Sequence, residues 1–398
     1  MASARRRVRA FLDQIRQLEA SDFPHADARQ ALAFIRDYFE TRQNLLRRMP
    51  DSVTDAVADE VCQNTNRSLS SYTEVLGFIL RSTNVRNAFE MHFPLKRLVQ
   101  QAVDPDARLI VSSEWNFVPF TYPMTLDLLP DFALVGGPAP ESGNPLIIPL
   151  AGHEIGHSAW RAHGGKEQVS PVALLGIDKA LDADPERRDA LLEELKKFGH
   201  DIEYLQNACL FSAMRQLEEV FCDQFGLYVF GEAYVYAYDY FLAPGGGVRT
   251  AGYPSARDRV RFLLDGAKVL EIAVDATLFA SWQESSPRAS LDGEILFFAD
   301  QAVDASVAEV RSLAFDILKS KDVARPDPAT TTKVDEAFQS QIPDCGGASL
   351  AEIVSAGWRY LRRKGGLSAE ADLAEYDMLC ELMLKSIEVS EFKLRVEA

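Results

Sequence analysis

The stretch GHEIGHSAWRAHGG, residues 152–165, decides how this chain is interpreted. It contains the pattern His-Glu-x-x-His in His153, Glu154 and His157. On an α-helix, residues four apart lie on one face, so both imidazoles can be directed at one metal ion. Glu154 lies about 100° around the helix from His153, within reach of a water at that ion. The spacing therefore predicts a zinc site with a general base.

Zinc held by protein at such a site needs a third ligand. His163 stands at the third-ligand position of the metzincin pattern HExxHxxGxxH, but Trp160 replaces the middle glycine. That glycine lets the helix stop and the chain turn back, in a conformation that is costly for tryptophan. If the helix instead continues to Gly164, His163 lies about 9 Å further along the axis than His157. His163 therefore remains the less favoured alternative.

A second source of ligands is the stretch LEEVFCDQFG, residues 217–226. It places Glu219 and Asp223 on one face of an otherwise apolar helix. Two buried carboxylates are costly unless positive charge meets them, and zinc with a ligating imidazole would supply that charge. Glu218 is an alternative ligand one position earlier, although no Asp follows it four residues later.

The combination of HExxH with a downstream Glu-x-x-x-Asp resembles the gluzincins, the thermolysin-like branch of zinc peptidases. The resemblance implies that His153, His157 and Glu219 bind Zn²⁺ and that Asp223 hydrogen-bonds a ligating histidine. It also implies hydrolysis of a peptide or protein substrate by a zinc-activated water, with Glu154 as general base. The 62 residues from His157 to Glu219 exceed the gap in thermolysin, so a helix within 184–198 would be an insertion.

Peptide hydrolysis also needs a donor for the developing oxyanion. The segment GYPSARDRVRFL, residues 252–263, resembles a His-Pro…Arg segment of some membrane-associated gluzincins, with Tyr253 in place of the histidine. Tyr253 is the candidate donor, and its basic partner would be Arg257, Arg259 or Arg261. The other candidate donors are His200, Tyr234, Tyr236, Tyr238 and Tyr240.

The expected fold class is α+β and predominantly α-helical, with a zincin-like catalytic core that contains a small β-sheet. We expect a helical N-terminal unit (1–105), a catalytic domain (106–275) and a helical C-terminal unit (276–398). The β-type runs at 108–113, 117–122 and 131–138 predict the sheet. The polar, proline-rich segment 324–347 predicts a long surface loop.

Composition limits the possible partners and compartment. The chain has 398 residues and a formal net charge of −17, which argues against nucleic acid or an anionic membrane as partner. Neither a secretory signal nor an apolar run long enough for a transmembrane helix is recognisable. Five scattered cysteines without a CxxC spacing indicate a reduced, cytoplasmic setting. The sequence leaves the oligomeric state open.

The sequence thus predicts a zinc-dependent metallopeptidase. Two alternatives remain open: a zinc hydrolase of non-peptide amides, and a non-catalytic binding or regulatory protein on a metallopeptidase fold.

Overall fold

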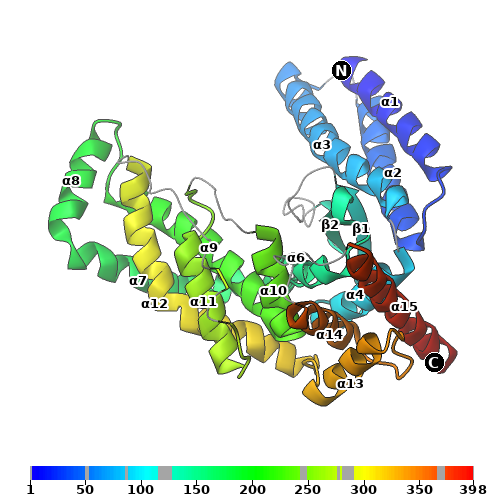
Figure 1. The fold of residues 1–398 in the computed structure, drawn as a ribbon. Helices are drawn as coiled ribbons and strands as arrows, with labels where there is room; N and C mark the ends of the chain where they lie inside the picture. The colour runs from blue at the N-terminus through cyan, green and yellow to red at the C-terminus, as the bar shows by residue number, and fades with distance from the viewer. Residues whose placement is uncertain are drawn as a thin grey trace. The chain divides into compact units, whose positions relative to one another are not determined.

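The computed structural model describes residues 2–49, 53–85, 88–114, 128–242, 249–275, 278–279, 291–364 and 373–397. These residues form a predominantly helical structure with one small two-stranded sheet, which confirms the expected α+β, mainly helical composition (Figure 1). Their contacts divide the chain into two units, residues 1–100 with 105–143 and residues 101–104 with 144–398. None of the described helices is both long and apolar enough to cross a membrane.

The first unit is built on three long helices, α1 (Ala2–Glu19), α2 (Ala26–Arg48) and α3 (Asp55–Arg81). Apolar residues at helical spacing, such as Val8, Leu12 and Ile15 on α1, form its buried core with residues of α2 and α3. The short helix η1 (Ser82–Asn84) and α4 (Ala88–Ala102) follow, and the last two residues of α4 belong to the second unit.

The sheet of the first unit pairs β1 (Arg108–Glu114) in parallel with β2 (Phe132–Pro138). Ile110 lies opposite Leu134 and Val111 lies opposite Val135, and all four side chains are buried. The strands expected at 108–113 and 131–138 are therefore present, whereas the run 117–122 lies outside the described residues. The short helix η2 (Ala139–Glu141) follows β2.

The second unit is organised around the long helix α9 (Ile202–Phe230), which is buried along most of its C-terminal half. Helices α6 (Ala151–Ala162), α7 (Gly165–Ala183), α11 (Ala256–Val269) and α12 (Leu291–Ser320) pack against it (Figure 1). The remaining elements are η3 (Pro145–Leu150), α8 (Pro185–Lys196), α10 (Glu232–Leu242), α13 (Pro328–Gln339), α14 (Leu350–Arg363) and α15 (Leu373–Glu397).

The expectation of a long surface loop over 324–347 is wrong, because α13 occupies the middle of that segment. Asp327 caps the helix by accepting a hydrogen bond from the Thr330 amide, and Pro328 takes the first helical position. Val334 and Phe338 lie four residues apart and are buried where α13 packs on α14. The helix was not recognisable from the sequence because most residues around this short apolar face are polar.

Candidate metal centre

The histidines are positioned by a close crossing of α6 and α9. A Cβ at Gly156 would lie 2.8 Å from Cα of Cys222, and a Cβ at Gly152 would lie 3.0 Å from Cα of Gly226. Only residues without a side chain permit this approach of the two backbones. The crossing therefore brings the His-Glu-x-x-His face of α6 against the acidic face of α9, in agreement with the pairing expected from the sequence.

Each imidazole is held at Nδ1 by a carboxylate of α9. Nδ1 of His153 lies 2.9 Å from Oδ1 of Asp223, and Nδ1 of His157 lies 2.9 Å from Oε1 of Glu218. A carboxylate accepts, so each Nδ1 carries the proton and donates it. The lone pair of a neutral ring is then on Nε2, which is the atom available to a metal.

Both Nε2 atoms face the same carboxylate. Nε2 of His153 lies 3.2 Å from Oε2 of Glu219, and Nε2 of His157 lies 3.8 Å from Oε1 of Glu219. Zinc bonds to nitrogen and oxygen of about 2.0–2.2 Å place tetrahedral ligand atoms about 3.3–3.5 Å apart. The chemistry of these three side chains suits zinc, and the 3.2 Å distance is close to this spacing, whereas the 3.8 Å distance to the second Glu219 oxygen is longer.

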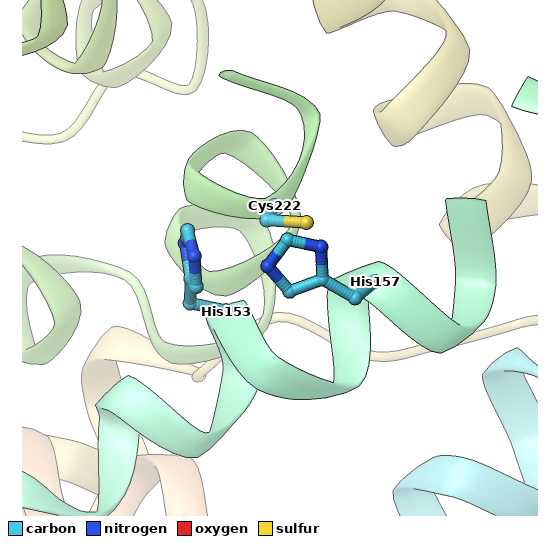
Figure 2. Close-up of side chains that lie close together, drawn as sticks. All are labelled: His153, His157 and Cys222. Carbon is cyan, nitrogen blue, oxygen red and sulfur yellow. The ribbon is translucent and has the colours of Figure 1, made fainter. Parts of the chain in front are cut away.

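A second donor set is present at the same crossing. His153, His157 and Cys222 each offer one ligand atom within 4.8 Å of the others, and all three are buried. Figure 2 shows the Cys222 side chain on α9 beside the two rings, with its sulfur directed across His157 rather than toward His153. Burial and the neighbouring carboxylates raise the pKa of the Cys222 thiol well above its usual value, so a ligating thiolate would require the metal itself.

Glu154 is the buried carboxyl group of the HExxH helix, with 4% of its surface exposed. Burial raises its pKa, and the nearby His153 and His157 only partly offset this effect. A carboxyl group with a raised pKa accepts and returns protons near neutral pH more readily than an ordinary glutamate. This is the property that the general-base role requires.

Asp223 connects His153 to a buried network. Arg259 of α11 donates to both Asp223 oxygens, at 2.7 and 3.0 Å, and the Tyr234 hydroxyl donates to Oδ1 at 2.8 Å. Burial raises the pKa of Asp223, but Arg259 and His153 outweigh it and hold that pKa below its usual range. Arg259 also lies 3.4 Å from Oε2 of Glu219, so one guanidinium spans both carboxylates.

These contacts determine the charge of the metal-free site. Burial lowers the pKa of His153, but its hydrogen bonds to Asp223 and Glu219 outweigh this and raise the pKa to about 10. The same contact to His153, with Arg259, lowers the pKa of Glu219 against the effect of burial. Without metal, a proton therefore occupies the place between His153 and Glu219, and a metal ion that bound there would have to displace it.

The predicted oxyanion donor Tyr253 is 48% exposed and its ring lies 5.5 Å from the Arg259 guanidinium. The negative charge of Glu219 is the largest influence that raises the Tyr253 pKa, so its hydroxyl keeps its proton beside the site. Of the three arginines considered, Arg259 meets the acidic network, whereas Arg261 pairs with Asp258 and Asp304.

Two other donor candidates are engaged elsewhere. The Tyr234 hydroxyl is committed to Asp223, and His200 stacks on Tyr204 with ring centroids 3.7 Å apart. Tyr236 and Tyr238 are buried aromatic residues of α10, at 4% and 1% exposure.

His163 does not reach the candidate metal centre. Helix α6 continues to Ala162, His163 is its C-terminal cap, and Gly164 makes the turn at φ +64°. Nε2 of His163 lies 2.8 Å from the carbonyl oxygen of Ala102. Trp160 is buried against Phe221 at a ring distance of 5.2 Å, which explains why the helix does not stop at this position.

Sequence reasoning missed the part that Glu218 takes in the site. The sequence suggests Glu218 only as an alternative ligand. In the structure its carboxylate accepts a hydrogen bond from Nδ1 of His157, in the same way that Asp223 accepts one from Nδ1 of His153. Cys222 is one of the five scattered cysteines, for which no role in the site was predicted from the sequence. Its position three residues after Glu219 on a helix was the available signal for its place on the same face.

The chain matches no family model, no curated protein and no solved structure.

Proposed function

We propose that the chain is a zinc-dependent peptidase with His153, His157 and Glu219 as ligands. The observation that carries the proposal is the convergence of both Nε2 atoms on the Glu219 carboxylate, with Glu154 buried beside them. Zinc, when bound, supplies Lewis-acid chemistry that polarises a carbonyl and lowers the pKa of a water molecule.

The side chains divide the remaining tasks. Glu154 accepts the proton of the attacking water and returns it to the leaving amine. Asp223 and Glu218 hold the two imidazoles in the tautomer that frees Nε2. Tyr253, half-exposed and protonated, is the side chain able to donate a hydrogen bond to the developing oxyanion. The substrate is a peptide or protein.

Cys222 favours a second candidate function. Four protein donors around one zinc ion form a closed site, which is typical of structural rather than catalytic zinc. If Cys222 joined the three proposed ligands, the chain would be a non-catalytic binding or regulatory protein that keeps a metallopeptidase-like site.

Digestion of a peptide library, followed by mass spectrometry, separates these functions. We expect zinc-loaded wild type to cleave, chelated protein to be inactive, and Glu154→Gln to keep its zinc while losing at least about 100-fold in rate. Wild type that holds one zinc per chain and cleaves nothing would favour the closed site. Cleavage by Glu154→Gln at the wild-type rate would exclude Glu154 as the base.

A further inference from the structure

A cavity of about 260 Å³ lies in the second unit, away from the metal centre. It is half open to solvent and is lined by the α9–α10 junction at Gly231, the chain after α11 and the segment before α13. Residues of α14 complete its wall. Asp223 and Gly231 are eight residues apart along α9, so the cavity is about 12 Å further along that helix. The volume is close to the lower end of small-molecule sites, about 300 Å³.

The wall is built from backbone conformations that fix its shape. Gly231 has φ 58° and ψ −134°, a region that essentially only glycine adopts. A Cβ there would lie 3.1 Å from Cγ of Pro326. Glu271 ends the α11 turn at φ 57°, and Pro326 and Pro328 restrict the opposite segment. Such a wall needs little ordering when a ligand binds.

Positively and negatively charged side chains both line the cavity. Arg325 donates one guanidinium hydrogen bond to the carbonyl of Leu270, and within the described part of the chain its other N–H groups have no hydrogen-bond or ion-pair partner. Glu271 is the next residue, and among the described residues its carboxylate forms no ion pair. Arg325 and Glu271 therefore flank the cavity as neighbours of opposite charge that do not pair with each other.

The rest of the cavity wall consists of one pair of charged side chains that bind each other and of apolar residues. Arg359 pairs with Glu232, so this second pair of charges is neutralised within the wall. Ile272, Ala273 and Pro326 contribute apolar surface. A ligand that fits this wall carries one anionic group, one cationic group and a short apolar body.

We propose that this cavity binds a zwitterionic α-amino acid with an apolar side chain. The amino-acid carboxylate would accept two parallel hydrogen bonds from the Arg325 N–H groups that do not bind Leu270. The ammonium group would take Glu271, and the side chain would lie against Ile272 and the prolines. Because Arg325 and Glu271 are both exposed to solvent, a ligand with a single charge would still bind but would meet only one of them. The proposal does not depend on peptidase activity.

Isothermal titration of the full chain with L-leucine, in the presence of a zinc chelator, tests the proposal. We expect one site per chain with a Kd of about 1 mM or tighter. N-acetyl-L-leucine and L-leucinamide each lack one charge and should bind at least about ten-fold more weakly. Absence of L-leucine binding, or equal binding of either analogue, would overturn the proposal without any variant having to fold.

Variants locate the site. Glu271→Gln and Arg325→Gln should each weaken L-leucine binding at least about ten-fold, because each removes one charged partner. Glu309→Gln and Arg311→Gln on α12 are the matched controls, since neither residue lines the cavity. Unchanged binding in both cavity variants, with their helical content intact, would place the ligand elsewhere. Since zinc is absent throughout, failure here is distinct from failure of the peptidase proposal.

Discussion

His153 and Asp223 join the two helices of the candidate metal centre, with 2.9 Å between Nδ1 and Oδ1. The same carboxylate accepts from Arg259 and Tyr234, so one side chain fixes both the tautomer of His153 and the position of α11. Such partners of a ligating histidine affect metal affinity strongly.

Replacing Asp223 by alanine should lower zinc affinity about 10–100-fold. It should also destabilise the fold by about 3–5 kcal/mol, because the buried Arg259 loses its main partner. Competition with a zinc chelator and urea unfolding measure the two effects. Asp182→Ala, at an exposed aspartate, is the control. Wild-type zinc affinity in Asp223→Ala would show that the contact does not orient His153.

Glu218 should behave as a partner of His157 and not as a ligand. Glu218→Gln retains an acceptor for Nδ1 and should keep zinc affinity within about ten-fold of wild type, whereas Glu218→Ala should lose more. Both variants should still bind one zinc per chain at saturating metal. Complete loss of zinc from Glu218→Gln would make Glu218 a ligand.

The close crossing of α6 and α9 predicts that Gly156 tolerates no side chain. Gly156→Ala should cost about 1–3 kcal/mol, because its Cβ would meet the Cys222 backbone. Gly252→Ala is the control in the same unit, since apart from its two chain neighbours no residue lies within 4 Å of its added Cβ. Urea unfolding of both variants measures the difference. Equal stability would mean that the helices are further apart than described.

The cysteines should differ in alkylation by iodoacetamide. Burial raises the pKa of Cys209 to about 12 and that of Cys222 well above its usual value. Native protein should therefore be labelled at the exposed Cys345 and remain unlabelled at Cys209 from pH 7 to 9, since its thiol stays protonated. Peptide mapping reads the sites. Labelling of Cys209 that rises with pH in this range would contradict the packing of α9.

The sequence predicted much of the site because helical spacing carries the relevant information. The i, i+4 spacing of His153 and His157 and that of Glu219 and Asp223 each define one helix face, whatever lies between them. Helical geometry also predicted the position of His163. Trp160 favours a helix that continues, and this places His163 beyond the face that carries His153 and His157.

Other features depended on long-range packing that no local pattern contains. Nothing in the sequence shows that Gly156 lies against Cys222 or that Arg259, rather than Arg257 or Arg261, points inward. Helix α13 was hidden because its apolar face consists of only a few residues in a polar, proline-rich segment. The sheet was recognisable from its apolar runs, but strand order and parallel register follow from pairing across the chain.

The zinc content of purified Glu219→Gln, relative to wild type, tests the proposed ligand set most directly. Wild type, Cys222→Ser and His163→Ala should each hold about one zinc per chain, as expected for a site with three protein ligands. Glu219→Gln should hold little or none after dialysis. A Glu219→Gln protein that keeps its zinc, together with a Cys222→Ser protein that loses it, would contradict the proposal and assign the third ligand to Cys222.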